Sequence, residues 1–146
     1  LVAHSLFRWL VLFSLASSII VAVRGLLKGK DFTKGTNSLR HWTATICHTQ
    51  LLIGIWLYTQ SPYIKYYFSA GGTNNGEQFF FSILHLALMV TSIVVVTIGS
   101  AKTKRLSSAS AKYHTVLWWY AAGLILILIA IPWPFSPLAN RPYIRY

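Results

Sequence analysis

Long apolar runs separated by short polar segments dominate the sequence. Four such runs lie at residues 2–23, 41–58, 79–98 and 113–131. The hydrocarbon core of a bilayer is about 30 Å thick and takes roughly 20 helical residues to cross. A helix also pairs its own backbone groups, which lipid cannot do. We therefore predict an all-α protein whose single domain, residues 1–146, is a transmembrane four-helix bundle with up-down-up-down topology.

Residues that interrupt regular helices mark the ends of these runs. Ser61-Pro62 ends the second run, because proline cannot continue a helix interior. The glycine-rich stretch 71–76 predicts an irregular loop before the third run. Three prolines close the fourth run: Pro132, Pro134 and Pro137. The second run is more polar in its first half, which holds Thr43, Thr45, His48 and Gln50.

Basic residues cluster in two connections and predict the orientation of the chain. The sequence has 13 Lys and Arg against 2 Asp and Glu, a net charge of +11. The connections after the first and third runs hold most of the cations: Arg24, Lys28, Lys30, Lys34, Arg40, Lys102, Lys104, Arg105 and Lys112. The opposite side holds Lys65, Arg141 and Arg145. Positively charged loops stay in the cytoplasm, so both termini are predicted on the outer, periplasmic side of a bacterial inner membrane.

Composition favours lipid over water or nucleic acid as the main partner. Hydrophobic residues make up 55% of the chain and charged residues 10%, whereas about 25% is usual for soluble domains. A basic chain can bind nucleic acid, but these cations sit in short loops between apolar runs, so no nucleic-acid binding is predicted. Cys47, the only cysteine, is expected to be a buried helix residue.

Histidines are the informative residues at membrane depth, because ionisable side chains there are costly and usually functional. Four of the five fall one per run: His4, His48, His85 and His114. In the predicted topology they form an outer pair, His4 with His85, and an inner pair, His48 with His114, each on diagonally opposed helices. Two facing imidazoles are what a six-coordinate b-type haem needs, so two haems are predicted along the membrane normal.

The partners of each pair differ in expected depth. His4 should lie closer to its membrane edge than His85 by roughly 5–8 Å at 1.5 Å per residue, and the inner pair is offset similarly. The alternative is that the histidines form hydrogen bonds between helices as packing groups. A zinc site would want three or four ligands at one depth, which the two-depth split does not favour.

Arg8 lies one helical turn from His4 and so on the same face. Its guanidinium could neutralise a haem propionate or hold an anionic head group. Alternatively, Arg8 extends to the outer surface or pairs with Glu77. Met89, one turn past His85, is expected to fill the core and not to bind iron.

Several phrases of the sequence resemble a small bacterial family of four-helix membrane proteins labelled cytochrome b-like. They are His4-Ser5-Leu6-Phe7-Arg8-Trp9, His48-Thr49-Gln50-Leu51-Leu52-Ile53-Gly54, Thr97-Ile98-Gly99 and Ile131-Pro132-Trp133-Pro134-Phe135. The resemblance covers most of the chain. It implies haem binding, with His4, His48, His85 and His114 as iron ligands. Relatives tend to have an acidic residue just before the third-run histidine, where this chain has Leu84.

The sequence lacks the catalytic residues expected for hydrolytic or transferase chemistry. Asp31 and Glu77 are its only carboxylate side chains and both lie in or near loops, so a paired acid–base mechanism is not expected. We expect at most a redox subunit, a b-type electron carrier that takes electrons from a membrane quinone in its quinol form. The alternatives are a cofactor-free accessory subunit of a larger respiratory or transport complex, and a small transporter or lipid-binding protein. Other membrane subunits are the expected partners.

Overall fold

Helices make up nearly all of the described chain. The structure, a computed structural model, describes residues 1–72, 76–137, 139 and 141–144. Its long helices are α1 (Val2–Lys28), α2 (Lys34–Gln60), α5 (His85–Arg105) and α6 (Ala109–Ala130). Shorter elements join α2 to α5: α3 (Pro62–Ser69), α4 (Gly76–Phe79) and the π-helical turn η1 (Phe80–Leu84). The described residues include no strand, which confirms the all-α class.

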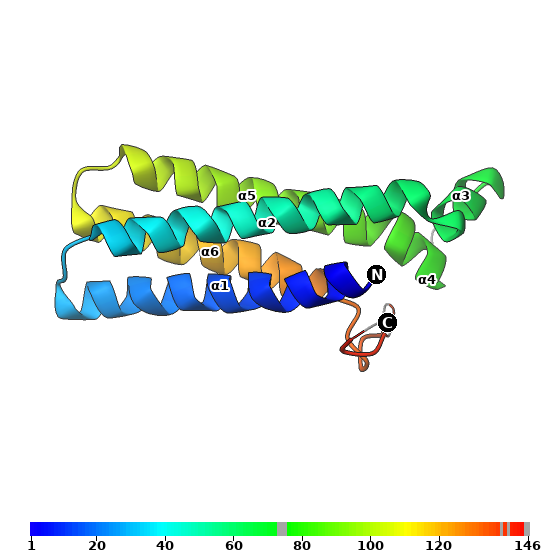
Figure 1. Cartoon of the computed structure of the whole chain (residues 1–146), viewed down its shortest axis with the longest axis horizontal. Helices are drawn as coiled ribbons and strands as arrows, with labels where there is room; N and C mark the ends of the chain where they lie inside the picture. The colour runs from blue at the N-terminus through cyan, green and yellow to red at the C-terminus, as the bar shows by residue number, and fades with distance from the viewer. Residues whose placement is uncertain (73–75, 138, 140, 145–146) are drawn as a thin grey trace.

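The long helices lie side by side (Figure 1). α1 packs against α2 and α6, and α5 packs against the same two helices, so α1 and α5 are diagonally opposed. We call one end the basic end; it holds the α1–α2 and α5–α6 connections and, among its cations, Lys28, Lys30, Lys34, Lys104, Arg105 and Lys112. At the other end, which we call the α3 end, gather the start of α1, the helices α3 and α4, and the segment after α6.

Local sequence explains where the helices begin and end. Thr33 caps α2, because its hydroxyl accepts a hydrogen bond from the Thr36 backbone N–H at 3.2 Å. Ser61 separates α2 from α3, which starts at Pro62, a favoured first position of a helix. α6 ends at Ala130, ahead of the three prolines, as predicted. In the 71–76 loop, Gly71, Gly72 and Gly76 have φ of 85°, 61° and 78°, and residues 73–75 lie outside the described part.

The helices extend beyond the apolar runs that predicted them. α1 continues to Lys28, and α2 begins at Lys34 instead of residue 41. The Thr33 cap starts α2 ahead of its apolar stretch, so the helix includes polar residues that the apolar pattern does not mark. The apolar pattern therefore locates the helices but underestimates their length.

Three of the helical stretches are long and apolar enough to cross a membrane. They are Val2–Lys28, Gly76–Arg105, which combines α4, η1 and α5, and Ala109–Ala130. α2 is as long as α1 but does not reach the same hydropathy, consistent with the polar first half noted in its sequence. A membrane location is thus supported by three helices, and α2 is not one of them.

Glycines allow the helices to approach one another closely. A Cβ at Gly25 of α1 would overlap the ring of Tyr113 on α6, and a Cβ at Gly99 of α5 would overlap Trp119 on α6. Around these contacts the core includes Leu15, Val96 and Tyr120, each fully buried. Tyr113 is 3% exposed, so it is a core residue although its place at the end of an apolar run is typical of an interfacial aromatic. Cys47 is buried, as predicted.

Candidate functional site

His4 and His85 meet between α1 and α5 near the α3 end. Their ring centroids are 6.4 Å apart and the ring planes are inclined at 69°. The α4–η1–α5 stretch extends beyond the start of α1 at this end (Figure 1). Two histidines far apart in sequence thus come into ring contact from diagonally opposed helices.

His85 is held in a fixed orientation. Its Nδ1 lies 2.8 Å from the carbonyl oxygen of Ala130, at the end of α6. A carbonyl only accepts hydrogen bonds, so Nδ1 carries the proton and the neutral ring has its lone pair on Nε2. The rings of Phe80 and Phe81 lie 5.9 and 6.1 Å from it, centroid to centroid. Both phenylalanines belong to the π-helical turn that immediately precedes His85, and such turns are frequent at functional sites.

His4 packs on α2 at a position where α2 has no side chain. A Cβ at Gly54 would lie 3.3 Å from His4 Cε1. Gln50, one turn earlier on α2, donates from Nε2 to the His4 carbonyl oxygen at 3.0 Å. Sequence reasoning did not single out Gln50 or Gly54, although both belong to the His48–Gly54 phrase that carries the family resemblance.

Three buried polar atoms near His4 lack hydrogen-bond partners among the described residues. They are His4 Nδ1, Arg8 Nε and Gln50 Oε1. Unpaired buried polar groups are costly, and most native structures pair them. The three atoms lie within one helical turn of His4 or on the adjoining face of α2.

The outer pair matches the spacing that two axial imidazoles require. Two metal–nitrogen bonds of about 2 Å each, with roughly 1 Å from each nitrogen to its ring centre, place opposed centroids about 6 Å apart. The observed 6.4 Å is close to that value. The Ala130 bond also gives His85 the partner on its far nitrogen that ligating histidines normally have. His4 and His85 would be the residues to hold a haem iron.

The inner pair is not brought together. His48 Nε2 lies 2.8 Å from Thr97 Oγ1 on α5. The Thr97 hydroxyl donates to the Ile93 carbonyl at 2.6 Å, so it accepts from His48, and this nitrogen is already used. His48 and His114 are both exposed, and the described ring contacts do not join them. The described residues also contain no cluster of three or more metal-ligating side chains.

Arg8 contacts the segment that follows α6. Its Nη2 donates to the Tyr143 carbonyl, and Trp9 Nε1 donates to the same oxygen at 3.3 Å. The ring of Trp133 lies 6.2 Å from that of Trp9. The segment after α6 thus folds back onto the first turns of α1, close to His4.

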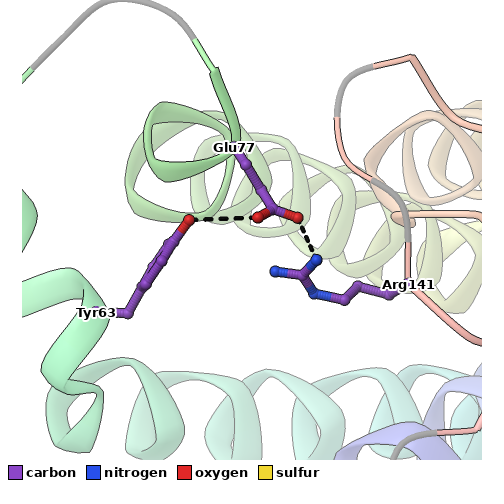
Figure 2. A network of polar contacts seen from close by, with 3 residues as sticks. All are labelled: Tyr63, Glu77 and Arg141. Atoms are coloured by element: carbon purple, nitrogen blue, oxygen red, sulfur yellow. Dashed lines mark hydrogen bonds and ion pairs between the residues drawn. The ribbon is translucent and has the colours of Figure 1, made fainter.

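Glu77 does not pair with Arg8. Its carboxylate forms an ion pair with Arg141 and accepts a hydrogen bond from the Tyr63 hydroxyl at 3.4 Å (Figure 2). Burial, and then the Glu77 charge, raise the pKa of Tyr63. The predicted alternative of an Arg8–Glu77 pair is therefore wrong, since Arg141 reaches Glu77 from the folded-back segment. Arg145 lies outside the described residues.

Comparisons with known proteins do not assign a family. No family model matches the chain, and no characterised protein or solved structure matches it either. The cytochrome b-like resemblance therefore stays a prediction, and functional inference depends on the site itself.

Proposed function

We propose that the chain is a b-type cytochrome-like electron-transfer protein of a bacterial inner membrane, with one haem held between His4 and His85. In this proposal α1, α2, the α4–η1–α5 helix and α6 cross the membrane as a four-helix bundle. Both termini and the α3 end then face the periplasm, because the basic end faces the cytoplasm. The haem supplies one-electron redox chemistry, and the protein supplies its ligands and surroundings.

The facing rings of His4 and His85 carry this proposal. They come from diagonally opposed helices, their centroids are 6.4 Å apart, and Ala130 fixes the tautomer of His85. The unpaired atoms His4 Nδ1 and Arg8 Nε add support, because they lie where a bound polar group is expected. Arg8 places a positive charge one turn from His4, suited to a haem propionate.

The proposal has one haem and not two because of the hydrogen bonding of the inner histidine His48. His48 uses Nε2 in a hydrogen bond with Thr97, which is the packing role that intramembrane histidines often have. A single haem on the outer side suits transfer between a membrane quinol and a partner at the periplasmic surface. Transfer across the whole bilayer would need a second centre, which the partner would supply.

The alternative, a cofactor-free accessory subunit, is favoured by one observation. The α3 end presents large exposed aromatic side chains, among them Phe135 at 75%, Tyr66 at 61% and Phe68 at 56% exposure. Exposed aromatic surface of this kind suits docking on a neighbouring membrane subunit. A haem protein could dock through the same surface, so the spectrum described next is what separates the two functions.

The test is a reduced-minus-oxidised visible spectrum of the full chain purified in detergent from its native membrane. We expect sharp α and Soret bands that correspond to about one haem per chain, since only one pair is opposed. His85→Gln should reduce the bound haem at least tenfold, because one axial ligand is lost. His114→Gln is the matched control, an exposed histidine whose loss should leave the bands unchanged.

Three results would contradict the proposal. A flat spectrum from well-folded native-membrane protein would leave the accessory-subunit function. Two haems per chain would restore the inner pair as ligands. Equal loss of haem in His85→Gln and His114→Gln would show that the bands report the general condition of the protein and not ligation by His85.

A further inference from the structure

An open cleft with polar and basic side chains lies between α2 and α5 near the basic end. Its volume is about 250 Å³. α2 contributes Arg40, His41 and His48, and α5 contributes Thr97, Ser100 and Lys104. Ala44 and Ala101 leave room between the helices. The cleft is separate from the His4–His85 site, which lies near the other end of the same helices.

Arg40 forms the floor of this cleft and is the unusual residue in it. Its side chain is only 5% exposed. Its Nη1 donates to the Ser100 carbonyl at 3.1 Å and to the Ser100 hydroxyl, and its Nε donates to Asn37 Oδ1 at 3.0 Å. These neutral acceptors fix the plane of the guanidinium. The Arg40 carbonyl is fixed as well, because the buried Tyr120 hydroxyl donates to it at 2.7 Å.

The chain supplies no counter-charge for Arg40. Only Asp31 and Glu77 are acidic, and Glu77 is paired with Arg141 at the α3 end. Asp31 lies in the exposed α1–α2 connection, and among the described residues no carboxylate is within ion-pair distance of Arg40. A guanidinium removed from water without a charged partner is unfavourable, so a compensating anion has to come from outside the chain.

The free donors of the cleft suit a phosphate group. Nη2 of Arg40 has no hydrogen bond to any described residue, and Arg40 lines both this cleft and a smaller pocket next to Tyr113. Lys104 and His41 line the same space and are exposed. A fixed guanidinium with a lysine beside it is the donor arrangement that phosphate oxygens favour.

We infer that this cleft binds the phosphate group of an anionic membrane lipid. Lipid is favoured over a soluble phosphate compound because of where the cleft lies. Its lining combines basic residues with the apolar Ala44 and Ala101, and the 60% exposed Trp42 contacts the ring of His41, which lines the cleft. Basic pockets between membrane helices at this level bind acidic head groups. The lipid would supply the negative charge that the sequence lacks around Arg40.

The test compares lipid adducts of the detergent-purified full chain by native mass spectrometry. The protein is incubated with equal amounts of phosphatidylglycerol and phosphatidylcholine. We expect phosphatidylglycerol adducts to predominate, because both lipids carry phosphate but only phosphatidylglycerol has a net negative charge. Lys104→Gln should lower them about fivefold, the contribution expected for one cation near an anionic lipid, and Arg40→Gln should lower them further.

Lys102→Gln is the matched control. Lys102 lies two positions earlier on α5 and places its ammonium over the Trp119 ring at 5.1 Å, away from the cleft. It should retain wild-type adducts. His41→Gln, an exposed change, gives a second readout in case Arg40→Gln does not fold, and should also weaken phosphatidylglycerol binding.

The contrary results are distinct. Equal retention of the two lipids would overturn the inference, and so would an equal loss in Lys102→Gln and Lys104→Gln, which would indicate diffuse attraction to the basic end. A parallel titration with inorganic phosphate tests the source of the anion. Phosphate binding that depends on Lys104, without a preference for phosphatidylglycerol, would assign the cleft to a soluble phosphate compound and overturn the lipid.

Discussion

The two ends of the molecule satisfy their charged groups in opposite ways. At the α3 end the carboxylate of Glu77 meets Arg141 within the chain, and Arg8 donates to the Tyr143 carbonyl. At the basic end Arg40 is buried among neutral acceptors, and the acidic side chain there, Asp31, forms no ion pair with the described residues. One end joins a cation to a carboxylate of the chain, whereas the other holds its buried cation with neutral acceptors.

This difference teaches how a chain with so few acidic residues can stay folded in a membrane. The few internal counter-charges are used where the segment after α6 must be held against α1 and α4. In the proposed topology the cationic end faces an anionic leaflet, which would compensate its charge along the surface. Substitutions matched between the two ends can therefore test whether each end is stabilised as its contacts indicate.

The largest expected effect comes from a pair of glycine substitutions, one per end. Gly25→Ala would place a methyl group into the Tyr113 ring, which cannot move aside because its hydroxyl donates to the Asp31 carbonyl at 2.9 Å. We expect a loss of about 2 kcal/mol in the free energy of unfolding. The cost of overpacking is partly offset by the higher helix propensity of alanine. The measurement is unfolding in detergent micelles titrated with SDS.

Gly54→Ala is the counterpart near the α3 end. Its methyl would meet His4 Cε1 at 3.3 Å, a contact that a small shift of the imidazole relieves, so stability should change by less than about 1 kcal/mol. The shift should appear instead in the haem bands, because it moves one proposed ligand. A larger loss for Gly54→Ala than for Gly25→Ala would contradict the packing described for the two ends.

An intermediate effect is expected from removing a tyrosine hydroxyl at each end. Tyr120 is fully buried and donates to the Arg40 carbonyl; Tyr58 is only partly buried and donates to the Ser82 carbonyl at 2.7 Å. Tyr120→Phe should cost about 1 kcal/mol and Tyr58→Phe less, since an unpaired group costs more where water is excluded. The same SDS titration compares the two variants. A larger loss for Tyr58→Phe than for Tyr120→Phe would indicate that water is excluded more completely at the α3 end.

The smallest effect is expected from Glu77→Gln. The ion pair with Arg141 is partly exposed, at 25% and 37% for the two side chains. Exposed pairs contribute below about 1 kcal/mol and weaken with salt. The loss should therefore be small at low salt and smaller still at high salt, measured by unfolding at two salt concentrations. A loss that does not depend on salt would contradict a mainly electrostatic contribution of the ion pair.

The apolar runs predicted the positions of the helices well, because a long apolar stretch in lipid must pair its own backbone groups. The end of α2 at Ser61 and the end of α6 at Ala130 also follow from local chemistry. Pro62 directly follows Ser61, and Pro132 lies two residues after Ala130. The helix starts did not follow. Residues 34–40 are polar and basic, and polarity alone does not distinguish a solvated loop from a solvated helical turn.

The candidate site was predictable in part. One histidine per run gave the His4–His85 pair, because alternating helix direction decides which histidines share an end. The failure of the His48–His114 pair depends on rotation about each helix axis, which places His48 against Thr97. No sequence pattern fixed that rotation. Arg40 was treated as a loop cation because the polar residues 34–40 were not recognised as helical, although Arg40 lies inside α2 and is buried.

The contact between Arg8 and Tyr143 has a consequence for how the protein is made. The two residues are 135 positions apart, so α1 is synthesised long before its partner segment. Until then the guanidinium of Arg8 and the ring of His4 have neither the folded-back segment nor α5 beside them. A chaperone, an insertase or a neighbouring subunit that shields the first turns of α1 during this interval would act at the step where the nascent protein is most vulnerable.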